Sequence, residues 1–163
     1  MKIDTQIVEF MNTLVVLLKE FRENDILTYS LGWNKLNVEL TYPGLEGSTG
    51  SILFDHKNSN VELHVKAPTD VLEFIFDESF DESFFKKEVL SAFTEWQDEL
   101  PELKLQGSWD NDKFSITSDI PEGKNFKAYV AIRKPYFGNM FIEIKTVVPF
   151  TLVKLIYKLL QQS

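Results

Sequence analysis

Residues 27–33 read Leu27-Thr-Tyr-Ser-Leu-Gly-Trp33, and residues 103–109 read Leu103-Lys-Leu-Gln-Gly-Ser-Trp109. Both segments alternate apolar residues with polar or small ones and end on a tryptophan, the pattern of strands with one face in water. The same ungapped shift aligns Val38-Glu-Leu40 with Phe114-Ser-Ile116, and after a small insertion residues 60–66 align with residues 139–145. The alignment predicts two copies of one folding unit.

Working outward from these segments, hydrophobic periodicity predicts three helices and eight strands. Helices are expected at residues 4–23, 82–100 and 149–161, where apolar residues recur at three- and four-residue spacing. Strands are expected at 27–31, 36–40, 51–54 and 61–65 in the first copy. In the second copy they are expected at 103–106, 113–118, 126–133 and 139–147, with a turn at 120–123.

These elements predict an α+β fold, internally duplicated as α-β4-α-β4-α. Strands joined by short turns pair antiparallel, and helices cover a sheet face, so we expect antiparallel sheet or sheets packed against helices with a pseudo-two-fold within the chain. Residues 1–163 are expected to form one domain, made of two structural repeats (about 4–70 and 82–147) plus a C-terminal helix at 149–161. One long sheet and two separate sheets are both compatible with this pattern.

Composition narrows the function classes. The chain of 163 residues contains no cysteine, which excludes disulfides, thiolate metal sites and thiol nucleophiles. Its formal net charge of −8 disfavours nucleic acid, because phosphate binding needs a concentrated positive surface. No apolar run approaches the length of a bilayer span, and no secretory signal precedes the first helix, so we expect a cytoplasmic protein without membrane contact.

The charge is concentrated in the middle of the chain. Residues 73–102 hold ten acids and two bases, a balance equal to the net charge of the whole chain, and phenylalanines are interleaved with the acids. Apolar anchors ringed by charge suit a surface that grips a basic, amphipathic protein partner. The alternative is that the phenylalanines staple a helix to the core while the acids face water. The candidate partner-binding residues are Phe76, Asp77, Glu78, Phe80, Asp81, Glu82 and Phe84.

No signature of catalysis accompanies this segment. The acids at residues 77–82 enter a helix, where carboxylates are favoured by the helix dipole alone. His56 and His64 are the two histidines, and we expect both to be solvated, without the spacing of a metal site. No phosphate-cradling glycine loop or nucleophile elbow is present. We therefore predict no catalytic residue, no metal and no cofactor.

A small-ligand binder or enzyme is the alternative function. Clefts form at interfaces between repeats, and Tyr29, Trp33 and Trp109 are the side chains we expect to line one.

The order of elements, the acidity and the apolar C-terminal helix together resemble the class I type III secretion chaperones. The similarity is one of layout over most of the chain, and it implies a non-catalytic module that binds a protein. Acidic immunity proteins, which plug the basic cleft of a toxin, have similar bulk properties. A homodimer through the C-terminal helix is a further expectation, because that helix carries a wide apolar face.

Overall fold

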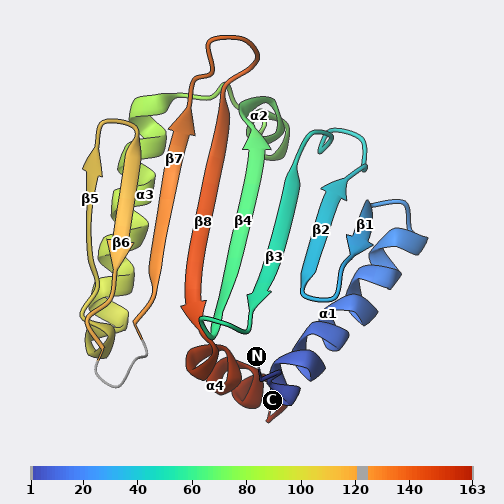
Figure 1. Ribbon diagram of the computed structural model, residues 1–163. Coiled ribbons are helices and arrows are strands. Elements are labelled where there is room, and N and C mark those ends of the chain that lie inside the picture. The colour runs from blue at the N-terminus through green and yellow to red at the C-terminus, as the bar shows by residue number, and fades with distance from the viewer. Residues whose placement is uncertain (1, 121–124, 163) are drawn as a thin grey trace.

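The computed structural model describes residues 2–120 and 125–162, and within them the chain forms four α-helices and one eight-stranded antiparallel sheet (Figure 1). The α+β class and the antiparallel sheet are confirmed. The turn expected at 120–123 lies mostly outside the described residues. The elements are α1 (Thr5–Glu23), β1 (Leu27–Leu31), β2 (Lys35–Leu40), β3 (Thr49–Asp55), β4 (Asn60–Pro68), α2 (Thr69–Phe76), α3 (Glu82–Glu99), the 3-10 turn η1 (Pro101–Leu103), β5 (Gln106–Asp110), β6 (Lys113–Thr117), β7 (Lys127–Arg133), β8 (Phe141–Pro149) and α4 (Phe150–Gln161).

The strands follow the order β1-β2-β3-β4-β8-β7-β6-β5, so β4 and β8 meet at the centre and β1 and β5 form the edges (Figure 1). The central pair is antiparallel and runs from Asn60 opposite Pro149 to Pro68 opposite Phe141. The described strands therefore belong to one continuous sheet, and the two-sheet alternative is wrong.

The stretch between the two sets of strands contains an additional helix, α2. The sequence pattern indicated only a short apolar piece at 71–76, because eight residues give barely two helical turns of periodicity. Pro68 is extended before the helix, and Asp77 ends it in the left-handed conformation with φ 53°. The helix-strand order is therefore α-β4-α-α-β4-α in place of the expected α-β4-α-β4-α.

The strand expected at 103–106 is also wrong. Pro101 suits the first position of a helical turn and opens η1, and Lys104 then takes a left-handed conformation with φ 48°, which breaks an extended run. Leu105 is buried between these elements, and β5 begins only at Gln106. The alternation of Leu103 and Leu105 therefore reflects burial around a turn.

The two tryptophans occupy different places in their hairpins. Trp33 lies in the turn between β1 and β2, where the Gly32 amide donates to the Lys35 carbonyl at 2.8 Å. Trp109 lies within β5, opposite Phe114 of β6. The ungapped alignment of Trp33 with Trp109 is therefore wrong, although both hairpins close with two-residue corners.

The helices pack on one side of the sheet. Register connects Phe54 to Val61 and Val61 to Val148, and on the same side of β8 it connects Ile144 through Val130 to Phe114. Two buried clusters lie on this side. The first joins α1 and α4 to β2, β3 and β4 (Ile7, Met11, Leu36, Phe54, Val61, Phe150 and Val153), and the second joins α3 to η1, β5 and β6 (Phe93, Leu105, Phe114 and Ile116).

The centre of the helix side is less covered than its two ends. Leu63 of β4 and Ile144 of β8 point to this side, yet each is 37% exposed. Figure 1 shows α3 lying against β5 and β6, far from α1 at the other end of the sheet. The opposite side of the sheet carries no described helix and presents mainly polar side chains.

Candidate functional site

The junction of α2 and α3 brings four phenylalanines close together in the sequence. The chain turns at Asp77, and five residues later α3 begins, capped by Asp81, whose Oδ1 accepts a hydrogen bond from the Phe84 amide at 3.1 Å. This tight reversal brings the end of α2 against the first turn of α3. Phe80 and Phe85 lie with ring centroids 5.5 Å apart, and both are half-buried.

An open cavity of about 460 Å³ lies between α2 and α3. Its wall is largely apolar, and two of its phenylalanines are exposed: Phe76 at 68% and Phe84 at 56%. Exposed apolar side chains that line one cavity, unlike those scattered singly over a surface, mark a candidate binding site. The lining residues are Leu72, Glu73, Phe76, Glu78, Ser79, Phe80, Asp81, Phe84, Phe85 and Glu88.

The rim of this cavity carries only negative charge. Four of its described lining residues are carboxylates (Glu73, Glu78, Asp81 and Glu88), and none is a base. The nearby Lys86 is held elsewhere: its Nζ lies 3.0 Å from Asp112 Oδ1, and it also lies over the Trp109 ring. We refer to this cavity, with its phenylalanine wall and carboxylate rim, as the acidic pocket.

Most of the candidate partner-binding residues meet in the acidic pocket. Phe76, Glu78, Phe80, Asp81 and Phe84 line it. Asp77 forms the left-handed end of α2, and Glu82 pairs with Lys134 outside the pocket. Sequence reasoning missed Leu72 and Glu73, because α2 was not expected. It also missed Phe85 and Glu88, although their place one turn into α3 was a usable signal.

The three residues proposed to line a pocket between the repeats are not brought together. Tyr29 lies in β1 and Trp109 in β5, and these strands are opposite edges of the sheet. Trp33 stacks on His56 with ring centroids 6.2 Å apart, whereas the indole N–H of Trp109 donates to the Lys86 carbonyl at 3.2 Å. A single pocket lined by all three is incompatible with this strand order.

His56 is buried, contrary to the expectation that both histidines are solvated. Its Nδ1 accepts a hydrogen bond from the Asp4 amide at 3.3 Å, and its ring packs edge-on against Phe150 with centroids 5.3 Å apart. This histidine therefore ties the start of α1 to the start of α4. Its surroundings are those of a packing residue.

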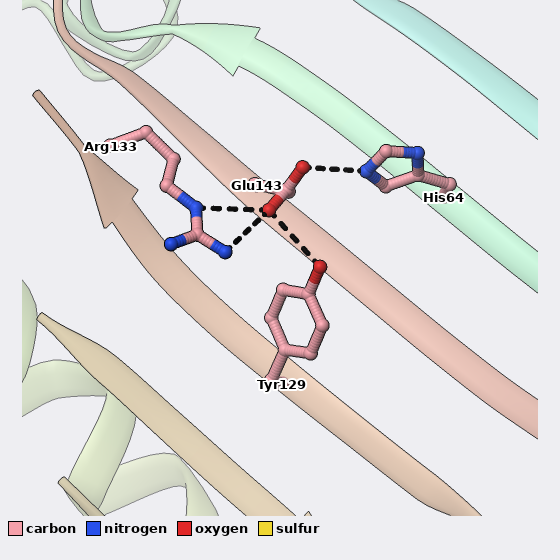
Figure 2. A network of polar contacts seen from close by, with 4 residues as sticks. All are labelled: His64, Tyr129, Arg133 and Glu143. Atoms are coloured by element: carbon pink, nitrogen blue, oxygen red, sulfur yellow. Dashed lines mark hydrogen bonds and ion pairs between the residues drawn. The ribbon is translucent and has the colours of Figure 1, made fainter. Parts of the chain in front are cut away.

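His64 belongs to a second cluster, on the polar side of the sheet (Figure 2). At its centre is Glu143 of β8, which is only 8% exposed and accepts hydrogen bonds from three side chains on two neighbouring strands. His64 Nε2 lies 2.7 Å from Oε2. Tyr129 OH donates to Oε1 at 3.1 Å, and Arg133 reaches the same oxygen with Nε at 3.0 Å and a terminal nitrogen at 2.9 Å.

These donors hold the Glu143 carboxyl in its ionised form. Burial alone would raise its pKa, but hydrogen bonds from His64, Arg133 and Tyr129 outweigh that effect and lower the pKa to about 2. Burial and Glu143 also raise the pKa of Tyr129. The sequence alignment had matched His64 with Glu143 as equivalent positions, whereas the two touch across the β4–β8 pair, where the register partner of His64 is Lys145.

No family model, curated protein or solved structure matches this chain. Among the residues that the structure describes, no helix has the length and apolar character needed to cross a bilayer.

Proposed function

We propose that the protein is a non-catalytic binding module for a basic, amphipathic segment of another protein, of the secretion-chaperone or immunity-inhibitor kind. The acidic pocket is the observation that carries this proposal. It combines exposed apolar anchors with an uncompensated ring of carboxylates, which is the complement of an apolar side chain flanked by lysine or arginine.

The energetics favour recognition of one or two anchor side chains. Burying a leucine- or phenylalanine-sized side chain against Phe76 and Phe84 contributes roughly 1.5–3 kcal/mol. Each flanking base adds little through an exposed ion pair, about 0–1 kcal/mol, and this part is screened by salt. Affinity then comes mainly from the anchors, and charge sets the preference for a basic partner and the rate of encounter.

We also propose that the chain is internally duplicated, with the two repeats forming the scaffold that carries the acidic pocket. The strand order sets β1 to β4 and β5 to β8 in mirrored sequence about the central pair. Aligned on their two-residue corners, the hairpins match Leu36 with Phe114, and both residues are fully buried. In this alignment Leu31, not Trp33, corresponds to Trp109.

A homodimer through α4 is a separate proposal about assembly. Phe150 and Val153 of α4 are buried in the first cluster, so the helix closes the core of its own chain. Leu155, Ile156 and Leu159 are left exposed. Light scattering tests this proposal: a dimer that becomes a monomer in L159E supports it, and a monomer at all concentrations refutes it.

The binding proposal is tested with a fluorescent model peptide, an amphipathic helix of leucine and lysine. We expect the protein to bind it with an affinity that falls as salt is raised, and to bind poorly a peptide in which glutamate replaces lysine. F76A and F84A should each weaken binding by about tenfold, in line with the loss of one anchor. Both side chains are exposed, so these variants keep the fold.

F137A is the matched control, because Phe137 is 86% exposed in the β7–β8 connection and lies outside the acidic pocket. Binding that is equally strong in F76A, F84A and F137A would remove the acidic pocket from the proposal. Equal binding of the lysine and glutamate peptides would remove the role of charge. A partner recovered from native lysate should show the same dependence on Phe76 and Phe84.

A further inference from the structure

A second hollow lies on the polar side of the sheet, over β1 to β4. It has a volume of about 460 Å³ and is open to solvent. Its floor consists of two rows of outward side chains that the strand registers place side by side. One row is Thr28, Glu39, Thr49 and Lys66, and the other is Ser30, Asn37, Ser51 and His64.

The hollow exists because its middle is floored by short hydroxyl side chains. Thr49 and Ser51 of β3 leave space between the longer side chains of β2 and β4. The two flanks differ in chemistry. On β4 stand Lys66 and His64, and on β2 stand Glu39 and Asn37. The hollow therefore has a cationic flank, a hydroxylated floor and a hydrogen-bonding flank of opposite charge.

One member of the cationic flank, His64, is held in place by a buried partner. The buried Glu143 holds His64 through Nε2, so the other ring nitrogen is directed away from that carboxylate, and Figure 2 shows it on the far side of the ring. The charge of Glu143 is in turn balanced by Arg133. Lys66 has no ion pair among the described residues, and its ammonium lies 5.7 Å from the Phe141 ring centroid.

We propose that this hollow binds a small phosphorylated polyol, with its phosphate on Lys66 and His64 and its hydroxyls on the β2 flank. Phosphate oxygens accept hydrogen bonds from the Lys66 ammonium, and His64 and the β3 hydroxyls are polar partners beside it: the register sets Thr49 opposite Lys66 and Ser51 opposite His64. Asn37 and Glu39 offer the paired planar acceptors and donors that vicinal hydroxyls need. The chain as a whole is acidic, so this cationic flank differs in sign from the net charge.

The distance between the flanks favours a ligand longer than a free amino acid. β2 and β4 are separated by two strand spacings, about 10 Å. The ammonium and carboxylate of an α-amino acid sit on one carbon, so they span much less than this backbone separation. A phosphate joined to a hydroxylated chain or ring spans them. The hollow is also separate from the acidic pocket, which lies between α2 and α3 beyond the end of β4.

The presence of only two histidines gives a direct test. Imidazole carbon-bound proton signals are recorded by NMR during titration with glucose 6-phosphate, inorganic phosphate and glucose, and H64Q assigns the His64 signals by their loss. We expect glucose 6-phosphate to shift the His64 signals saturably. Inorganic phosphate should act about tenfold more weakly and glucose without detectable effect at equal concentration. The buried His56 is the internal reference and should not move.

K66Q should weaken binding of glucose 6-phosphate by about tenfold or more, as expected for loss of a charged hydrogen bond. K35Q is the matched control, because Lys35 is also an outward lysine of the polar side but does not line the hollow. The proposal is overturned if no probe shifts His64 saturably, or if K66Q and K35Q bind alike. Equal affinity for phosphate and glucose 6-phosphate overturns the role assigned to the β2 flank. Circular dichroism verifies that each variant keeps the fold.

Discussion

The two buried clusters differ in how completely helices cover them. Under β2 to β4, α1 and α4 pack together, with Phe10 and Tyr157 rings 5.5 Å apart and a Thr13–Tyr157 hydroxyl contact at 3.2 Å. Under β5 and β6, α3 packs with only a 3-10 turn beside it, and Phe93 meets Phe114 edge-on at 5.1 Å. Stability is therefore expected to be uneven, with the α3 end opening first. One wall of the acidic pocket comes from α3, the helix of this less protected end.

Truncating the central phenylalanine of each cluster tests this difference with the largest effect. F54A and F114A each remove a fully buried ring, and each should lower the free energy of unfolding by about 3–5 kcal/mol. Hydrogen exchange should separate them. F114A should deprotect α3, β5 and β6 and leave α1 and β1 to β3 protected, whereas F54A should deprotect the whole chain.

Uniform loss of protection in both variants would break the comparison, because the two clusters would then open as one unit. If either alanine variant fails to accumulate, F54L and F114L keep the test available, with smaller cavities and the same expected pattern.

Glu143 of β8 connects the two halves of the sheet through its contacts with β4 and β7. Its contribution to stability should appear in acid unfolding. Its folded pKa of about 2 lies below the ordinary 4.5, so its stabilisation is complete above about pH 4.5 and is lost as the pH falls toward 2. The contribution amounts to about 3 kcal/mol. In urea titrations between pH 7 and pH 2, E143Q should be less stable at neutral pH and lose less stability on acidification than the parent. E62Q, an outward residue of β4, is the control, and an identical acid dependence of E143Q and the parent would contradict the role of the network.

Most of the fold could be predicted from long segments with clear hydrophobic periodicity. Helices α1, α3 and α4 were expected within one or two residues of their ends, because each shows several turns of amphipathic spacing. The clustering of Phe76, Phe80 and Phe84 near acids was also visible in the sequence. The position of β5 was not, because the alternation of Leu103 and Leu105 predicted a strand at 103–106, whereas these residues lie in and just after the 3-10 turn η1 and β5 spans Gln106–Asp110.

The polar network around Glu143 could not be predicted from the local sequence. His64 and Glu143 are 79 residues apart, and only the β4–β8 register brings them together. Nothing in the neighbouring sequence distinguishes Glu143 from a solvated strand residue, and its burial arises from donors on β4 and β7. The hollow on the polar side is equally non-local, since it depends on which short side chains four strands place in adjacent rows.

Gly107 of β5 and Gly50 of β3 test the comparison between the two clusters with stability changes of intermediate size. A Cβ at Gly107 would lie 2.9 Å from Phe93 Cζ and 3.0 Å from Phe114 Cε1, so G107A should push α3 from the sheet and cost about 1–3 kcal/mol. A Cβ at Gly50 would meet nothing closer than 3.7 Å, and G50A should be neutral or slightly stabilising. Thermal unfolding measures both changes. A neutral G107A would mean that α3 moves away without loss, so that its packing contributes little.

The helix caps give the smallest contrast. Asp4 Oδ1 accepts from the amides of Gln6 and Ile7, and its carboxylate pairs with Lys154 of α4. The Asp81 carboxylate accepts from one amide, that of Phe84, among the described residues. D4A should therefore cost about 1–2 kcal/mol, and D81A about 0.5–1 kcal/mol, in chemical unfolding. K154M separates the two parts of the Asp4 effect, because it removes the ion pair and leaves the cap. If D81A costs as much as D4A, the start of α3 is as firmly held as that of α1, and the uneven stability must come from the sheet contacts of α3 alone.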